Sequence, residues 1–121
     1  MKGLYLWSRL LAGFFGFTTL LGILWFSGSQ GKVFVTAALV MGFSSLLASF
    51  ISPRALSSSK AASAFVTMLC VAGVGGGFVL ITDDFSATDG IEWHVIAIRL
   101  LHIGALGILA GRALKLLPEP T

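Results

Sequence analysis

The stretch that decides the fold runs from Glu92 to Lys115 and reads EWHVIAIRLLHIGALGILAGRALK. It can cross a bilayer, because about 20 mostly apolar residues span the hydrocarbon core as a helix. The same stretch carries both histidines of the chain, an arginine well inside the apolar run, and regularly spaced glycines. We therefore expect a transmembrane helix here that also holds the most informative polar side chains.

The rest of the chain repeats this apolar pattern. Its 121 residues are 56% hydrophobic and only 11% charged, whereas soluble domains carry about 25% charged residues. Three further apolar runs precede the last one, with short polar segments between them. We predict an all-α membrane protein, a single integral membrane domain over residues 1–121, with four transmembrane helices in an antiparallel bundle. The predicted helices cover approximately residues 4–27, 33–52, 60–82 and 91–116.

Two local features define the first and second helices. The first run has a basic start, as a cleaved signal peptide would, but it is longer than a signal-peptide core of about 7–15 residues. We therefore expect it to be retained as a helix. Pro53 cannot continue a helical hydrogen-bond ladder, so it is predicted to end the second helix, and Arg54 to Lys60 to form a polar loop.

The basic residues predict the orientation in the membrane. With four crossings, the N-terminal segment, the loop between the second and third helices, and the C-terminal segment lie on one side. These segments carry most of the flanking basic residues, namely Lys2, Arg9, Arg54, Lys60, Arg112 and Lys115. Because Lys and Arg bias their segments toward the cytoplasm, both termini should be cytoplasmic. We expect the protein in the bacterial inner (cytoplasmic) membrane.

A candidate polar site combines the fourth helix with the acidic segment before it. Placing an arginine against lipid costs at least about 2.5–3.5 kcal/mol, so Arg99 should face protein, water or a headgroup. Arg99 and His102 lie one turn apart on one helical face. Asp83, Asp84 and Glu92 are the available counter-ions; alternatively they form a solvated acidic loop and Arg99 extends toward the interface. These five residues make up the predicted site.

His102 has several interpretations, because a histidine near the bilayer middle can ligate haem, bind a quinone or relay a proton. The alternative is an imidazole that is hydrogen-bonded to a serine or carbonyl on a neighbouring helix. His94 lies eight positions earlier, about 12 Å along the axis, and points another way. The two histidines therefore cannot clamp one haem iron, and bis-histidine ligation would need His102 of a second chain.

Glycines predict where helices pack closely. Small residues let neighbouring membrane helices approach backbone to backbone, and each apolar run has glycines or other small residues at helical spacing. The predicted packing positions are Gly13, Gly16, Gly42, Gly73, Gly76, Gly107 and Gly111. Gly107 and Gly111 form a GxxxG step, which should bring another helix close, either in this chain or from a partner. The tract from Gly73 to Gly77 lacks the Lys-Ser/Thr of a phosphate loop.

Several chemistries are excluded or unsupported. Cys70 is the only cysteine, which excludes an internal disulfide, a CxxC redox pair and a cysteine zinc cluster. The acidic segment DDFSATDGIE does not match the ligand offsets of an EF-hand. We therefore predict no catalytic residues, no enzymatic activity and no metal site. No cofactor is expected either, unless haem or quinone binds at His102.

Three functions are consistent with these features. The first is a non-catalytic accessory or assembly subunit of a larger membrane complex. The second is a small homo-oligomeric transporter or channel that uses Arg99, His102 and the outer acidic loop. The third is a haem- or quinone-binding membrane anchor. The expected partners are the lipid bilayer and other membrane-protein subunits or further copies of the chain, and not nucleic acid.

Overall fold

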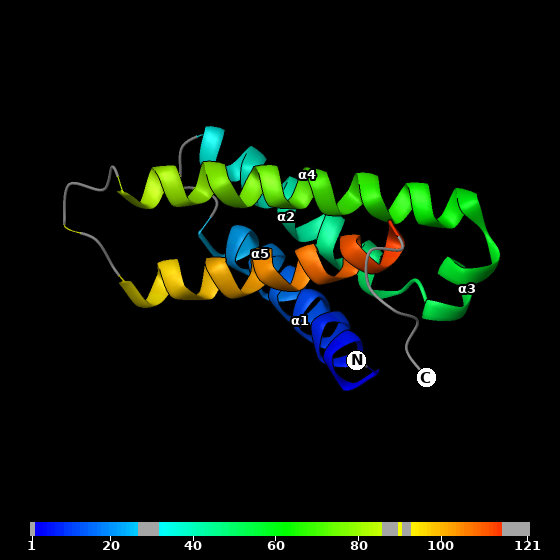
Figure 1. Cartoon of the computed structure of the whole chain (residues 1–121). Coiled ribbons are helices and arrows are strands. Elements are labelled where there is room, and N and C mark those ends of the chain that lie inside the picture. The colour runs from blue at the N-terminus through cyan, green and yellow to red at the C-terminus, as the bar shows by residue number, and fades with distance from the viewer. Residues whose placement is uncertain (1, 27–31, 86–89, 91–92, 115–121) are drawn as a thin grey trace.

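Four long helices make up most of the molecule (Figure 1). The computed structural model describes residues 2–26, 32–85, 90 and 93–114. The long helices are α1 (Lys2–Phe26), α2 (Lys32–Ser49), α4 (Lys60–Phe85) and α5 (Trp93–Ala113). The short helix α3 (Pro53–Ser58) joins α2 to α4. Every regular element within these described ranges is a helix, which confirms the predicted all-α class.

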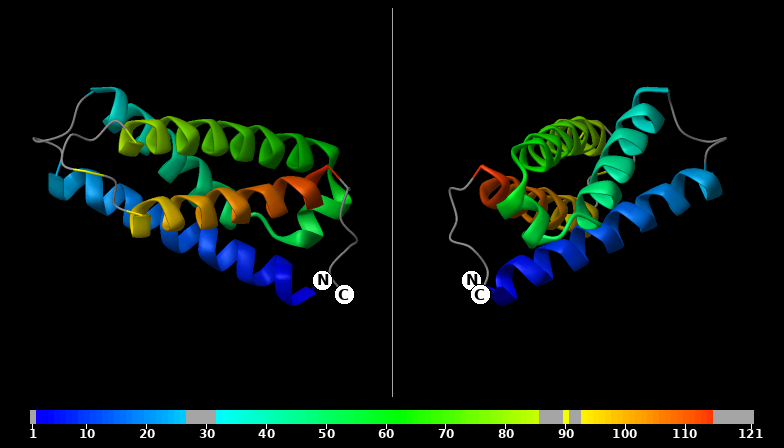
Figure 2. Two further views of the ribbon diagram at one scale, coloured as in Figure 1. Left: turned by 60° about the vertical axis from the view of Figure 1, so that its left-hand side comes forward. Right: turned by 90° about the vertical axis from the view of Figure 1, so that its right-hand side faces the viewer.

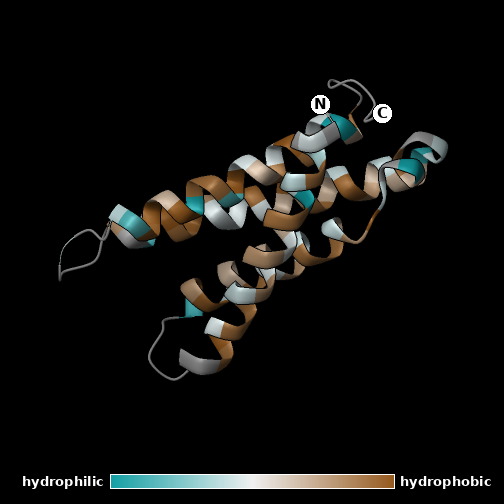
Figure 3. Cartoon of the chain, turned by 90° about the horizontal axis from the view of Figure 1, so that it is seen from below, coloured by the Kyte–Doolittle hydropathy of each residue, from teal (hydrophilic) through white to brown (hydrophobic). Residues whose placement is uncertain are grey.

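Each long helix is long and apolar enough to cross a membrane. The four candidate spans contain 20, 18, 24 and 21 residues, within the range of about 17–25 that bilayer-crossing helices use. Figure 3 shows hydrophobic residues along most of each helix and hydrophilic residues mainly near the helix ends. Large apolar side chains such as Phe14, Leu24 and Met68 are more than half exposed, as lipid-facing residues are. These features support an integral membrane protein.

The long helices form a ring in which each one packs against two others. α1 lies between α2 and α5, and α4 lies between the same two helices on the other side. α4 and α5 run side by side, whereas α1 is inclined to them (Figures 1 and 2). α3, the start of α1 and the end of α5 lie at one end of the molecule (Figure 2). In this ring α2 and α5 lie across the bundle from each other.

Two helix ends differ from the predicted ones by three residues and change the segment that follows them, at α2 and at α4. α2 ends at Ser49 rather than at residue 52, because the residue before a proline is disfavoured in helical conformation; Ser52 is extended, with ψ 156°. α4 continues to Phe85 rather than ending at residue 82. The sequence had suggested that Asp83 lies in a loop, but it lies in the last turn of α4.

The predicted polar loop after Pro53 is also partly wrong, because it contains α3. Ser52 is the N-cap of this helix, and its hydroxyl accepts a hydrogen bond of 3.2 Å from the Ala55 backbone N–H. Pro53 occupies the first helical position, where its missing N–H costs nothing. The Ser63 hydroxyl of α4 donates to the Leu56 carbonyl at 2.9 Å, which ties α3 to α4.

Glycines bring α2 into close contact with α1 and α4. A β-carbon added at Gly16 of α1 would lie 2.9 Å from the carbonyl oxygen of Gly42 in α2. A β-carbon at Gly76 of α4 would lie 2.8 Å from the carbonyl oxygen of Ala37, also in α2. A larger residue at Gly16 or Gly76 would collide with the α2 backbone, so these two crossings depend on glycine.

Other glycines accept side chains from a neighbouring helix. A β-carbon at Gly73 would lie 2.7 Å from a methyl group of Leu106, and one at Gly77 would lie 2.8 Å from Ile103. Both of these glycines are on α4 and both side chains come from α5. The tract that contains them is continuous α-helix. Gly73, Gly76 and Gly77 therefore provide close packing, and the tract does not break the helix.

Candidate functional site

Arg99 and His102 of α5 face the interior on the side of α1 and α2. His102 is only 3% exposed, and Arg99, one turn earlier, is half-buried. Leu106 and Leu109 continue the buried face toward the end of the helix. A lipid-facing position would leave the guanidinium and imidazole without polar surroundings, so α5 is oriented with these groups inward and with Leu100 and Leu101 outward.

His102 is hydrogen-bonded to a serine across the bundle. Its Nε2 atom lies 2.5 Å from the Ser45 hydroxyl oxygen of α2. The Ser45 hydroxyl donates its own hydrogen to the Met41 carbonyl, at 2.7 Å. Because a hydroxyl has a single hydrogen, we infer that Nε2 carries a hydrogen and donates it to Ser45. This is the serine partner on another helix that the packing interpretation of His102 requires.

An aromatic ring of α1 packs against the imidazole of His102. The Phe15 ring of α1 lies with its centroid 5.6 Å from that of the imidazole, tilted by 38°. Together with the burial of Ser45 at 0% exposure, this contact places the imidazole inside packed protein. Binding of haem or a quinone at His102 stays a prediction, and it would require Phe15 or Ser45 to move.

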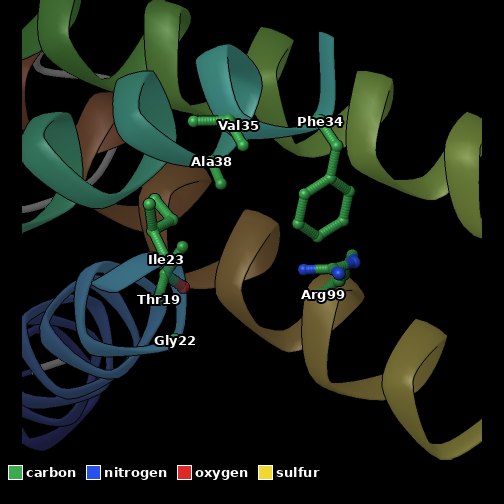
Figure 4. Close-up of a pocket in the computed structure, with 7 residues that line it drawn as sticks. All are labelled: Thr19, Gly22, Ile23, Phe34, Val35, Ala38 and Arg99. Carbon is green, nitrogen blue, oxygen red and sulfur yellow. The ribbon is translucent and has the colours of Figure 1, made fainter. Parts of the chain in front are cut away.

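Arg99 also reaches toward α2. Its Cζ atom lies over the Phe34 ring, 5.8 Å from the ring centroid, which is a cation–π distance. Arg99 and Phe34 line a pocket of about 170 Å³ between α1, α2 and α5 (Figure 4). The other lining residues are Thr19, Gly22, Ile23, Val35 and Ala38. A positive charge therefore faces a small cavity whose walls are otherwise mostly apolar.

The acidic part of the predicted site is only partly described. Asp83 is exposed in the last turn of α4. Glu92 and the side chain of Asp84 lie outside the described residues, so the predicted ion pair between Arg99 and these acids stays a prediction. Within the described ranges, no three His, Cys, Asp or Glu side chains form a group that could hold a metal ion.

The predicted packing glycines fall into two groups. Gly13, Gly16, Gly42, Gly73 and Gly76 all meet a neighbouring helix of this chain at or below 3.0 Å from an added β-carbon. By contrast, an added β-carbon at Gly107 or Gly104 would have no described atom within 4 Å. No crossing within the described part of the chain therefore uses Gly107. Close contact of Gly107 with a helix of a partner protein stays a prediction. The same holds for the predicted packing role of Gly111.

Two arginines have structural contacts that the sequence analysis missed. Arg112 in the last turn of α5 is only 2% exposed. Arg112 follows Leu109 by three residues and His102 by ten, a spacing that places all three on the buried face of α5. The burial of Arg112 could therefore have been predicted from the sequence. Arg9 of α1 donates from Nε to the Ser49 carbonyl at 3.1 Å, at the end of α2.

Comparison with known proteins gives no family for this chain. No protein-family model, curated protein or solved structure matches it. The interpretation of the site therefore depends on the residues and contacts described above.

Proposed function

We propose that this protein is a non-catalytic accessory or assembly subunit of a larger membrane complex. In this proposal the four long helices form an antiparallel bundle in the bacterial inner membrane, with both termini in the cytoplasm. The distribution of basic residues supports the orientation: Arg9, Arg54 and Lys60 belong to segments that would share the cytoplasmic side. The Asp83 end of α4 would then face the outside.

The observation that carries the proposal is the outward glycine face of α5. The glycines at the close crossings contact a neighbouring helix, and Gly22 and Gly75 are single open positions. Gly104 and Gly107, one turn apart on α5, are both open among the described residues. Glycine in a helix interior lowers helix stability by about 1 kcal/mol relative to alanine. Close approach of another helix would offset this cost. We therefore assign the face of Gly104 and Gly107 to a helix of a partner subunit.

The transporter or channel alternative receives support from one observation, the charged pocket at Arg99. His102 weakens this alternative, because a buried imidazole bonded to Ser45 does not line an open path. The same burial weakens the haem- or quinone-binding anchor. The polar groups of α5 instead support a structural role, in which they hold α5 against α2.

The test is purification of the chain at native expression level, followed by mass spectrometry and measurement of stoichiometry. We expect a fixed partner subunit in a constant ratio. Gly107→Leu should abolish its co-purification while the variant itself still folds, since no described atom lies within 4 Å of an added β-carbon. Gly75→Leu is the matched control, because Gly75 of α4 is equally open. A lone homo-oligomer that Gly107→Leu leaves intact would overturn the proposal in favour of the transporter alternative.

A further inference from the structure

A groove opens between the start of α4 and the end of α5, at the end of the molecule where α3 lies (Figure 1). Its volume is about 490 Å³, within the roughly 300–1,000 Å³ of pockets that hold drug-sized ligands. Two of its apolar lining residues, Met68 of α4 and Leu114 just after α5, are 69% and 55% exposed. The groove therefore opens toward the surroundings of the bundle, which in a membrane are lipid molecules.

Lys60 places a positive charge in this groove at the surface of the membrane. It is the first residue of the 24-residue candidate span of α4. Such a span is about 36 Å long, whereas the hydrocarbon core is about 30 Å thick, so its first residue lies at the hydrocarbon boundary in either orientation. Lys60 is exposed, and a long lysine side chain at this position extends outward into the layer of lipid phosphates.

The charge at this end of the bundle favours an anionic ligand. The charged side chains described here are all basic, namely Arg9 of α1, Arg54 of α3, Lys60 of α4 and Arg112 of α5. At the opposite end of α4 the described charges include an acid, because Asp83 lies in the last turn of that helix. Basic pockets between transmembrane helices are suited to the headgroups of anionic lipids.

The wall of the groove beyond Lys60 suits a hydrocarbon chain. Ser63 and Thr67 contribute hydroxyls to this wall, but both hydroxyls donate to backbone carbonyls, of Leu56 at 2.9 Å and of Ser63 at 2.8 Å. A hydroxyl has a single hydrogen, so these two groups keep none for a ligand. The other lining residues beyond Lys60 are apolar. From Lys60 to Met68 the wall follows α4 for about 12 Å.

We propose that this groove, the Lys60 groove, binds one anionic phospholipid, with the phosphate at Lys60 and one acyl chain along α4 toward Met68. The ammonium group supplies a charged hydrogen-bond donor to the phosphate. A zwitterionic phospholipid with the same chains carries no net charge, so it should bind more weakly at this basic end. The site does not depend on the subunit function proposed above, because all its lining residues come from a single chain.

The experiment uses the full chain in a neutral detergent and counts retained lipids by native mass spectrometry. The two probes are phosphatidylglycerol and phosphatidylcholine with the same palmitoyl and oleoyl chains, and they are titrated separately. The dissociation constant of the first retained lipid should be about fivefold lower for phosphatidylglycerol, the factor expected for one lysine at an anionic lipid surface. Circular dichroism in the same detergent checks that each variant is folded.

Two pairs of variants test the charge and the groove separately. Lys60→Gln should raise the dissociation constant of phosphatidylglycerol about fivefold, whereas Arg54→Gln removes an exposed arginine at the same end and should leave it nearly unchanged. Ala64→Leu keeps Lys60 but places a larger side chain at an exposed position in the groove, and it should abolish retention of the first lipid. Ala97→Leu is its control, because Ala97 is exposed on α5 and does not line the groove.

Three results would overturn the proposal. Equal dissociation constants of the two lipids would show that the net charge of the lipid is not recognised. Equal weakening by Lys60→Gln and Arg54→Gln would indicate a general charge effect, and this comparison decides if Ala64→Leu does not fold. A folded Ala64→Leu variant that binds phosphatidylglycerol unchanged would place the lipid elsewhere. Since the measurement needs no partner subunit, each outcome is separate from success or failure of the subunit proposal.

Discussion

His102 of α5 and Ser45 of α2 are hydrogen-bonded although their helices lie across the bundle from each other, with 2.5 Å between Nε2 and Oγ. Arg99 makes a second link in the same direction, to Phe34 of α2. Neighbouring helices in the ring meet through glycines and apolar side chains. Arg99 and His102 thus link α5 to α2 through the interior of the bundle.

The first prediction concerns the energy of this cross-bundle hydrogen bond. A double-mutant cycle with Ser45→Ala and His102→Ala should give a coupling energy of about 0.6 kcal/mol, and at most about 1.7 kcal/mol, as for hydrogen bonds in other helical membrane proteins. Unfolding equilibria in mixed micelles provide the measurement. His94→Ala, at an exposed position of α5, is the control and should show no coupling to Ser45. A coupling energy of zero would mean that the bond is not formed.

The second prediction compares adjacent glycines of α4. Gly76→Leu should lower the free energy of unfolding by at least about 1–3 kcal/mol, the usual cost of overpacking, because its β-carbon would lie 2.8 Å from the Ala37 carbonyl. Gly75→Leu should be nearly neutral for the isolated chain, since nothing lies within 4 Å. Thermal unfolding of both variants in one detergent measures the difference. Equal stability of the two variants would contradict the α2–α4 crossing.

The third prediction concerns Arg9 at the end of α2. Arg9→Ala should destabilise the protein by roughly 1–2 kcal/mol, because the Ser49 carbonyl loses a charged donor near the negative end of the helix dipole. Arg9→Lys keeps the positive charge and should recover part of the loss. Arg54→Ala removes an exposed arginine and should change the unfolding free energy by less than about 0.5 kcal/mol. Destabilisation by Arg54→Ala as large as by Arg9→Ala would argue for a general charge effect.

The fourth prediction uses the single cysteine. Cys70 is 0% exposed in the folded chain, so a thiol-reactive maleimide should label it only after unfolding. Labelling measured against temperature should follow the loss of helical circular dichroism. Rapid labelling of the native protein would show that the core around Cys70 opens locally.

The fifth prediction is the orientation in the membrane. Reporter fusions after Arg54 and after Thr121 should read as cytoplasmic, whereas a fusion after Gly90 should read as external. The reason is that Lys and Arg are concentrated in the N-terminal segment, the α2–α4 connection and the C-terminal segment, and these residues favour the cytoplasmic side. A C-terminal fusion that reads as external would remove the proposed orientation.

Much of the fold could be predicted because apolar length and glycine spacing act locally. Runs of about 20 apolar residues define membrane helices whatever their neighbours are, and glycines such as Gly16, Gly42 and Gly76 mark close crossings because no other residue fits there. α3 was missed for a local reason as well. Pro53 was interpreted only as a helix terminator, although Ser52 before it also gives the signal of a helix start.

The partners of the polar residues could not be predicted, because they depend on the order of helices around the ring. The sequence indicated that His102 would need a hydrogen-bonding partner, but not that Ser45 would provide it. Similarly, the acids close to Arg99 in sequence were the expected counter-ions, which stays a prediction, and the contact of Arg99 with Phe34 of α2 was not expected. Helical periodicity identifies the inward face of α5 and leaves open which helix that face meets.

The arrangement of the crossings also has a consequence for how the chain is made. α1 and α2 are synthesised first, and their contact at Gly16 and Gly42 needs no later part of the chain. α4 can then join through Gly76, again on α2. Of these four helices α5 is made last, and it carries His102 and the Leu106 and Ile103 side chains that pack against Gly73 and Gly77 of α4. During insertion α5 is therefore the helix that completes this four-helix bundle. The hydrogen bond between His102 and Ser45 can form only at that stage.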